Sequence, residues 1–285
     1  MSCNSNNNIG LHLRLKDSVL DLAQQAREYN IKFFQFFLTA SVKDTRYIKI
    51  NAQEREQFIQ LRKDFFSELY IHSSYWINPA VGNIATLAIS KKSLKKEIAI
   101  ARQLSIRTIV LHPGSASGHI QTPEDPICKA LGIQTIAKLL LDIAQKNPDI
   151  EILLENTTHA NRSIGSNLND FTTLREIFKN TPNINFCLDI AHAFAYGYDV
   201  SNIDEFIQTL DKTMGLNRIK LIHLNDNNET CGSKKDNHVL PGNGQIGINI
   251  LRQYYYHPLF QHIPKILELP VTSPENTKNT LNLFL

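Results

Sequence analysis

Six short apolar stretches of the sequence each end in a histidine or a carboxylate. These six residues are His72, His112, Glu155, Asp189, His223 and Glu268. A single histidine or acid at such a place is usually structural, or it caps the next helix. Six in succession favour one shared explanation, because mixed imidazoles and carboxylates are the usual ligands of zinc and similar divalent ions. The pattern therefore predicts a metal centre.

Three further ligand-type residues lie outside these stretches. His192 follows Asp189 by three residues, and Asp236 and His238 have a D-x-H spacing. In an extended segment alternate side chains share a face, so Asp236 and His238 can approach one ion. Alone this spacing is a weak signal, since Lys234-Lys235-Asp236-Asn237 also has the composition of a solvated loop. Together with His192, the pair predicts a further metal position.

The elements that must position these residues alternate along the whole chain. The expected strands are Ile9–Leu13, Ile31–Phe37, Leu69–His72, Thr108–His112, Glu151–Glu155, Asn185–Asp189, Ile219–His223 and Lys265–Glu268. Several are unbroken hydrophobic runs, which suit strands buried on both faces. The expected helices are Asp17–Tyr29, Gln53–Phe66, Ala85–Leu104, Lys129–Gln145, Leu168–Lys179, Ile203–Met214, Ile246–Tyr255 and Glu275–Phe284.

Eight strand–helix units in a chain of 285 residues predict an α/β fold, a single (β/α)8 TIM barrel. We expect the barrel over residues 9–285 and a frayed segment over the Asn-rich residues 1–8. A doubly wound open sheet is less favoured, because no Gly-rich nucleotide loop is present. All strands of a TIM barrel end on one face, so the metal site is expected at the C-terminal face, where converging carboxylates need cations to offset their repulsion.

Composition and cysteine usage limit the class of protein. Hydrophobic residues make up 42% of the chain, enough for a large core, and no apolar run is long enough to span a membrane. The N-terminus lacks a hydrophobic signal core. None of the four cysteines forms a CxxC pair, which favours the cytoplasm or another reducing intracellular compartment over secretion. We expect Cys187 to be a small core residue and Cys231 to be a bystander rather than a thiolate ligand.

Several ordered motifs resemble the endonuclease IV family of abasic-site (AP) endonucleases, also called AP endonuclease family 2. The resemblance covers nearly the whole chain, from Gly10 to Pro270. The most specific motifs are His72–Asn78, Leu111–Gly114, Leu154–Thr157, Asp189–Asp199, His223–Asp226, Asp236–His238 and Gly242–Gly247. The resemblance implies a centre of about three Zn²⁺ ions per chain, with Mn²⁺ as an option at one position.

The resemblance also implies nine protein ligands, and all nine positions are matched. The three overlapping sets are His72, His112 and Glu155; then Glu155, Asp189, His223 and Glu268; then His192, Asp236 and His238. Glu155 or Glu268 would additionally orient the nucleophile or accept its proton. The implied reaction is hydrolysis of the phosphodiester bond 5′ to an abasic site in double-stranded DNA, a step of base excision repair. It would leave a 3′-hydroxyl and a 5′-deoxyribose phosphate.

DNA recognition is the less regular part of the resemblance. Candidate DNA contacts are Tyr75, Trp76, Arg46, Lys43, His12 and Asn237. Asn237 stands where family members commonly have arginine, and the segment from Thr39 to Tyr47 aligns loosely with the family's lesion-probing loop. The net charge of +3 is too small to indicate nucleic-acid binding alone, but three divalent ions would raise it to about +9. We expect a monomer.

Two rival functions stay open. Sugar isomerases and epimerases share this barrel and also place Glu, Asp and His around one or two metals at the strand ends. The third set, His192 with Asp236 and His238, separates the two functions, because an isomerase does not need a third ion. The other rival is a non-catalytic lesion-binding protein, which a complete set of ligands disfavours.

Overall fold

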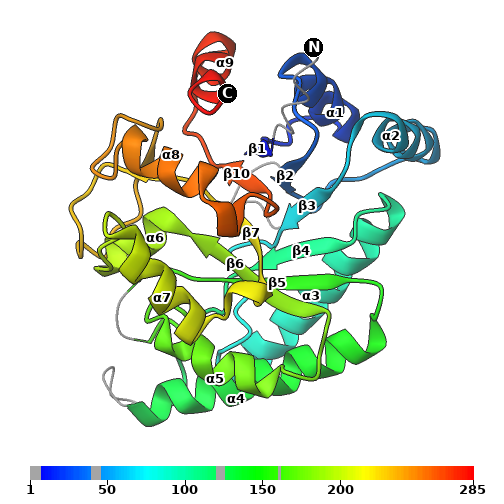
Figure 1. Cartoon of the computed structure of the whole chain (residues 1–285). Coiled ribbons are helices and arrows are strands. Elements are labelled where there is room, and N and C mark those ends of the chain that lie inside the picture. Colours follow the sequence, from blue (N-terminus) through cyan, green and yellow to red (C-terminus); the bar gives the residue numbers. More distant parts are fainter. Residues whose placement is uncertain (1–7, 40–45, 120–125, 160–161) are drawn as a thin grey trace.

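The computed structural model describes residues 8–39, 46–119, 126–159 and 162–285. Eight parallel strands close into a barrel in the order β1-β10-β7-β6-β5-β4-β3-β2 (Figure 1). The strands are β1 (Ile9–His12), β2 (Phe34–Phe37), β3 (Leu69–His72), β4 (Thr108–Leu111), β5 (Glu151–Glu155), β6 (Ile184–Asp189), β7 (Ile219–His223) and β10 (Lys265–Leu267). The predicted TIM barrel is confirmed, and the open sheet is excluded.

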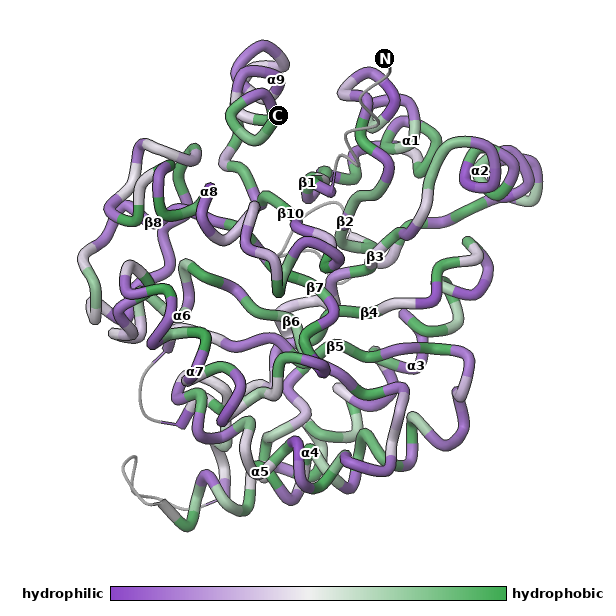
Figure 2. Tube along the Cα trace, viewed as in Figure 1, coloured by the Kyte–Doolittle hydropathy of each residue, from purple (hydrophilic) through white to green (hydrophobic). Residues whose placement is uncertain are grey.

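Helices follow the strands and cover the outside of the barrel (Figure 1). They are α1 (Val19–Glu28), α2 (Ala52–Phe65), α3 (Ile84–Gln103), α4 (Pro126–Lys146), α5 (Asn169–Ile177), α7 (Ile203–Thr213), α8 (Ile248–Tyr256) and α9 (Pro274–Asn282). Ser18 caps α1 by accepting a hydrogen bond from the Leu20 amide. Figure 2 shows the reason for this layering, because hydrophobic residues dominate the strands and alternate with hydrophilic ones along the helices.

Short elements between the main units were not predicted. They are α6 (Ile190–Tyr196), the antiparallel pair β8 (Asp226–Asn227) and β9 (His238–Val239), and the 3₁₀ turns η1 (Leu216–Arg218) and η2 (Pro258–Phe260). The expected strands at residues 9, 108 and 265 each end one residue early, so His112 and Glu268 lie just past their strands. The second strand begins three residues later than expected, at Phe34.

One layer of side chains fills the middle of the barrel. It consists of Phe33, Tyr70, Val110, Leu153, Cys187, Leu221 and Ile266, all buried. Cys187 is therefore a core residue, as expected. Side chains two positions apart on a strand share a face, so the residue two positions beyond each member also faces the barrel axis, nearer to the C-terminal end.

Two further expectations concern membrane-spanning segments and the N-terminal residues. No helix in the described ranges is long and apolar enough to cross a membrane. The frayed N-terminal segment lies, except for Asn8, outside the described residues. Asn8 itself is anchored, since its side-chain amide donates to the carbonyls of Gln261 and Ile263.

Candidate metal centre

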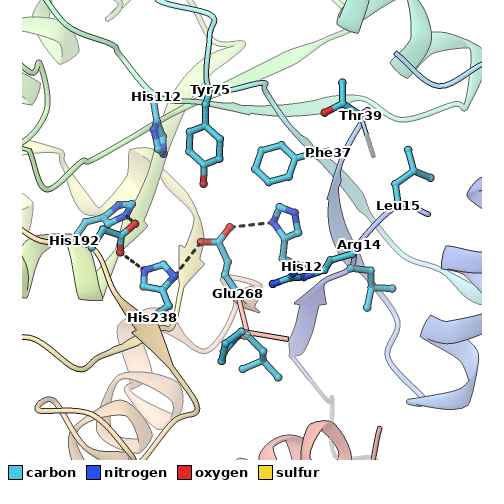
Figure 3. A pocket seen from close by; sticks show the side chains of 14 residues that line it. His12, Arg14, Leu15, Phe37, Thr39, Tyr75, His112, His192, His238 and Glu268 are labelled. Carbon is cyan, nitrogen blue, oxygen red and sulfur yellow. Dashed lines mark hydrogen bonds and ion pairs between the residues drawn. The ribbon is translucent and has the colours of Figure 1, made fainter. Parts of the chain in front are cut away.

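The candidate ligands line a cavity at the C-terminal ends of the barrel strands. The cavity has a volume of about 440 Å³, and its lining includes His112, His192, Asp236, His238 and Glu268 (Figure 3). Each strand-end ligand lies two positions beyond a member of the central layer. Barrel geometry thus converts a repeated spacing in the sequence into a ring of polar side chains.

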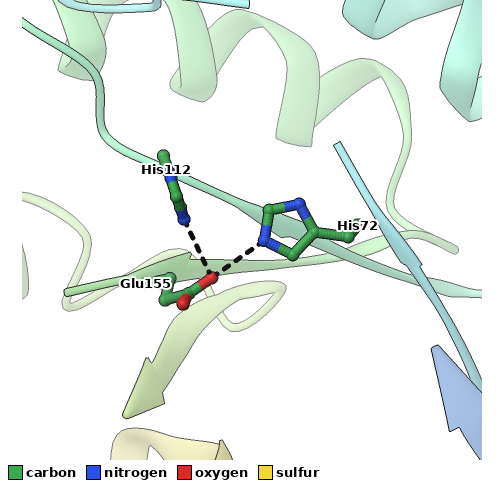
Figure 4. A group of neighbouring side chains, drawn as sticks. All are labelled: His72, His112 and Glu155. Atoms are coloured by element: carbon green, nitrogen blue, oxygen red, sulfur yellow. Dashed lines mark hydrogen bonds and ion pairs between the residues drawn. The ribbon is translucent and has the colours of Figure 1, made fainter. Parts of the chain in front are cut away.

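The first set of ligands meets around the carboxylate of Glu155. His72 Nε2 lies 3.0 Å from Glu155 Oε2, and His112 Nε2 lies 3.3 Å from the same oxygen (Figure 4). The other ring nitrogen of His72, Nδ1, lies 2.9 Å from the Ser73 carbonyl. That carbonyl can only accept, so Nδ1 carries the proton and a lone pair on Nε2 faces the centre.

The second set shares Glu155 with the first. His223 Nδ1 lies 3.0 Å from Glu155 Oε1, 3.8 Å from Asp189 Oδ2 and 3.7 Å from Glu268 Oε2. Donor atoms of these four residues all lie within 4.8 Å of one another. The two oxygens of Glu155 therefore face different sets, which is the arrangement that a bridging carboxylate requires.

The third set comes from α6, from β9 and from the loop between β8 and β9. His192 Nε2 lies 3.3 Å from Asp236 Oδ2, and His238 Nε2 lies 2.8 Å from Asp236 Oδ1. Asp236 and His238 thus approach each other, as expected from their spacing. Donor atoms of Asp189, His192 and His238 also lie within 4.8 Å of one another. Asp189 thus lies between the second and third sets, which the sequence did not indicate.

Charge is densely packed in this cavity. Burial alone would raise the pKa of Glu155, but His223 and His112 outweigh it and hold the pKa well below the usual value. Burial raises the pKa of Asp189 despite nearby histidines. Burial would lower the pKa of His192, but the carboxylates of Asp189 and Asp236 raise it well above the usual value. Without other cations, the acids depend on protonated imidazoles for compensation.

One contact of the third set, between His238 and Asp236, fits a divalent cation better than it fits a hydrogen bond. His238 Nε2 is buried and lies 2.8 Å from Asp236 Oδ1, yet it forms no hydrogen bond of acceptable geometry. A nitrogen and an oxygen that approach in this way are well placed to bind one cation through their lone pairs. The donor set, imidazole nitrogen mixed with carboxylate oxygen, is the set that zinc prefers.

Sequence reasoning missed three buried amides that hold the ligands. Asn225 Nδ2 donates to Asp189 Oδ2 at 2.8 Å and to Glu268 Oε2 at 3.1 Å. Asn156 Nδ2 donates to the Asp189 carbonyl at 2.9 Å. Gln35 lies against Glu268 at 2.8 Å. The available signal was positional, because Gln35 lies two residues beyond Phe33, a member of the central layer.

The candidate DNA contacts fall at different distances from the cavity. Tyr75 is 53% exposed and lines the cavity, with its ring 5.5 Å from that of His112. Trp76 packs edge-on against Tyr47 at 6.1 Å. His12 is turned toward Glu268 at 3.1 Å, in the cavity wall.

The remaining candidates lie on loops. Asn237 and Arg46 are exposed. Asn237 lies 3.5 Å from a Glu229 oxygen, and Lys43 lies outside the described residues. Contact with DNA by any of these residues therefore remains a prediction.

The two cysteines near the centre lie where the sequence predicted, Cys187 in the core and Cys231 apart from the ligands. Cys231 is exposed and its thiol points to the Tyr198 carbonyl at 3.7 Å, away from the ligands. The buried thiol of Cys187 instead groups with donor atoms of Glu155 and His223. Burial raises the pKa of this thiol to about 12, so by itself it is protonated at neutral pH.

Comparison with known proteins decides the family. Residues 23–284 match the family model described as xylose isomerase-like TIM barrel. A probable endonuclease 4 from Thermosipho africanus is 33% identical over 272 residues, which cover 92% of each chain. The chain belongs to the endonuclease IV family. The crystal structure of endonuclease IV from Thermus thermophilus is 28% identical, covers 97% of each chain and has a TM-score of 0.81.

The fold is also shared with sugar-converting enzymes. A D-tagatose 3-epimerase-like protein has a TM-score of 0.69 and 20% identity, and the match covers 96% of this chain and 94% of that protein. This likeness concerns the barrel alone. The barrel therefore does not by itself separate this chain from the epimerases, and the difference must lie in the site.

Proposed function

We propose that this protein is a metal-dependent endonuclease that hydrolyses the phosphodiester bond 5′ to abasic sites in double-stranded DNA. The products are a 3′-hydroxyl and a 5′-deoxyribose phosphate. The observation that carries the proposal is the meeting of nine ligand-type side chains in three overlapping groups at one cavity. Relatives at about 30% identity over most of the chain bear the name probable endonuclease 4, which supports the same activity. We infer that the protein acts as a monomer.

The centre would hold about three Zn²⁺ ions, with Mn²⁺ as an alternative at one position. His72, His112 and Glu155 form the first set; Glu155, Asp189, His223 and Glu268 the second; His192, Asp236 and His238 the third. Bound ions would supply a nucleophile at neutral pH and neutralise charge on the phosphate oxygens. Glu155 and Glu268 face the same space and are suited to orient that nucleophile or accept its proton.

Tyr75 is the best placed side chain to enter the DNA. Its ring packs on Phe37 at 5.2 Å and remains 53% exposed at the cavity rim. Apolar or aromatic wedges at such rims unstack a duplex and help to expose a nucleotide. Trp76 is suited to support the rim, because it packs on Tyr47.

Incision of a duplex with one abasic site tests the proposal. Protein of measured metal content should cut the strand 5′ to the site, and EDTA should abolish cutting until zinc is restored. Fully loaded protein that leaves this duplex intact would refute the proposal. Tight duplex binding without EDTA-sensitive cutting would instead support the non-catalytic rival. One ion per chain with sugar epimerisation would support the epimerase.

A further inference from the structure

Gln35 is a fully buried amide that contacts three polar side chains of the centre. It is the second residue of β2, within the otherwise apolar run Phe33–Phe37. Its Nε2 lies 2.8 Å from Glu268 Oε1 and 2.9 Å from His12 Nδ1, and its Oε1 lies 3.0 Å from His223 Nε2. Burying an amide is costly unless its hydrogen bonds are made. Here every polar atom of the side chain has a partner.

The Glu268 carboxylate determines which way the amide is oriented. An ionised carboxylate has acceptor atoms only, so the Gln35 atom at 2.8 Å from it must be the NH₂ group. The opposite orientation would place two oxygen atoms in contact. The amide oxygen of Gln35 consequently faces His223. The hydrogen-bond partners of Gln35 thus fix which end of its amide is nitrogen and which is oxygen.

The orientation of the amide in turn selects the tautomer of His223. Gln35 Oε1 can only accept, so His223 Nε2 must carry the proton that it donates at 3.0 Å. In the neutral imidazole the other nitrogen, Nδ1, then has a free lone pair. Nδ1 is the atom that faces Glu155 Oε1 at 3.0 Å and Glu268 Oε2 at 3.7 Å. The lone pair therefore points to the centre.

The other buried histidines of the centre obtain their tautomers from the main chain. His72 Nδ1 lies 2.9 Å from the Ser73 carbonyl, and His192 Nδ1 lies 2.8 Å from the Asn156 carbonyl. His223 differs, since its tautomer is set by a side chain, that of Gln35. That side chain also binds Glu268, so one residue connects two ligands of the second set. A side-chain partner, unlike a carbonyl, can be removed by substitution.

We propose that Gln35 is a positioning residue that holds His223 as the Nε2–H tautomer and orients the Glu268 carboxylate, so that both ligands present their donor atoms to the metal centre. The proposal rests on the proposed metal centre but not on DNA incision. Partners that orient ligating histidines usually strengthen metal binding by about 10- to 100-fold. Gln35 is fully buried, so it acts through the ligands that it contacts.

Zinc affinity of a Gln35→Met variant tests this role. Methionine has nearly the same length but offers no amide. The matched control is Asn185→Leu, which removes another buried strand amide that bonds Glu151 and the Pro182 carbonyl, away from the centre. Competition against a chelator of known affinity should show zinc bound about 10- to 100-fold more weakly in Gln35→Met. Affinity should be unchanged in the control, and thermal melting in EDTA verifies that both variants fold.

The proton on His223 gives a second readout that a merely structural role would not change. Zinc-loaded protein with ¹⁵N-labelled histidine should show His223 with its proton on Nε2, assigned by the signal lost in His223→Gln. In Gln35→Met zinc still requires the proton on Nε2, but its signal should shift and the proton should exchange faster with water, because its acceptor is lost. Unchanged zinc affinity together with an unchanged His223 signal would overturn the proposal while leaving the endonuclease assignment intact. Normal zinc binding without incision would overturn that assignment alone.

Discussion

The candidate ligands differ in burial, and this difference predicts how many of the metal sites each substitution would affect. Glu155 and Asp189 are fully buried and face two sets each, whereas the Asp236 side chain is 33% exposed and belongs to the rim. A residue at the rim can be changed without disturbing the barrel. A residue that faces two sets cannot be changed without affecting both.

Replacing Asp236 with asparagine should therefore remove one metal ion and leave the others. The amide keeps the shape of the side chain but loses the charge that His192 and His238 face at 3.3 Å and 2.8 Å. Metal analysis should find about two ions per chain instead of three, with incision reduced at least about 100-fold. Glu155→Gln is the comparison, and it should lose two ions. Full occupancy in Asp236→Asn would contradict the assignment of the third set.

Tyr75 is expected to act on duplex DNA rather than on hydrolysis itself. Tyr75→Ala should lower activity on abasic duplex by about 10- to 100-fold, because stacking of an aromatic ring on a base is worth about 1–3 kcal/mol. Hydrolysis of a small phosphodiester should change little. The control is Tyr256→Ala on α8, since Tyr256 is 52% exposed and does not line the cavity. Equal losses on both substrates would argue against a wedge.

At the scale of elements, α3 secures the loop that carries Tyr75. Glu97 of α3 is fully buried, and its Oε1 accepts from the Ser74 hydroxyl at 2.6 Å and from the Ser74 amide at 3.2 Å. These contacts join the outer helix layer to the first residues beyond β3. The helix thus holds in place the start of the loop that follows His72, a candidate ligand.

Glu97→Ala should lower the free energy of unfolding by about 2–4 kcal/mol, because it leaves a buried amide and hydroxyl of Ser74 unpaired and opens a cavity. Urea denaturation measures this loss. Glu176→Ala serves as the control, since that carboxylate is exposed and pairs with Lys179, just beyond the end of α5. A loss no larger than the control's would show that the loop is held by other contacts.

A buried lysine at the opposite end of the barrel makes the free energy of unfolding depend on pH. Burial lowers the pKa of Lys265, the first residue of β10, from 10.5 to about 8. Between these values the unfolded chain binds more protons than the folded one, so the free energy of unfolding rises with pH from about 8 to 10.5. The penalty for burying the charge is complete below pH 8 and absent above 10.5.

A comparison of the wild type with Lys265→Met should show the contribution of this lysine to the pH dependence of stability. The difference in unfolding free energy between the two should change by about 3 kcal/mol across that window, in favour of the wild type at high pH. Chemical denaturation at several pH values provides the measurement, and the ionisation of tyrosines cancels in the difference. Parallel stability curves would show that Lys265 is not titrating as described.

Elements were predicted well where their signal was long or periodic. The eight strands were predicted because unbroken apolar runs mark them, and the eight main helices because helical periodicity marks them. The helix α6 was not predicted, because it has only seven residues and its N-cap, Asp189, was already interpreted as a ligand. The pair β8–β9 was not predicted, because two-residue strands have no periodicity, although the D-x-H spacing suggested an extended segment.

For the whole molecule, metal ions should contribute directly to stability. Four carboxylates converge in one cavity, so the metal-free protein contains unrelieved repulsion that bound ions remove. At a zinc concentration about 1,000-fold above the dissociation constant, the folded state should gain about 4 kcal/mol. Zinc-loaded protein should therefore melt several degrees higher than EDTA-treated protein. Mg²⁺ at equal ionic strength is the control, and identical melting curves would contradict a metal centre.

Candidate site residues could be named from the sequence where their type is conspicuous, and not where only their place in the barrel matters. Histidines and acids at strand ends are conspicuous in a sequence, so all nine candidate ligands were named, and their binding of metal stays a prediction. Gln35 was not found, because a glutamine within an apolar strand has no chemical signature until the central layer beneath it is known. The position of Asp189 between two sets also required coordinates.

Shared ligands link the three sets into one unit. Glu155 faces the first and second sets, and Asp189 lies between the second and third. We therefore expect an ion in one set to order a carboxylate that the neighbouring set needs, so that later ions would bind to a site already formed and loading would be cooperative. In a cell short of the metal, the population would then divide into fully loaded and empty molecules, so scarcity would change how many copies work rather than how well each copy works.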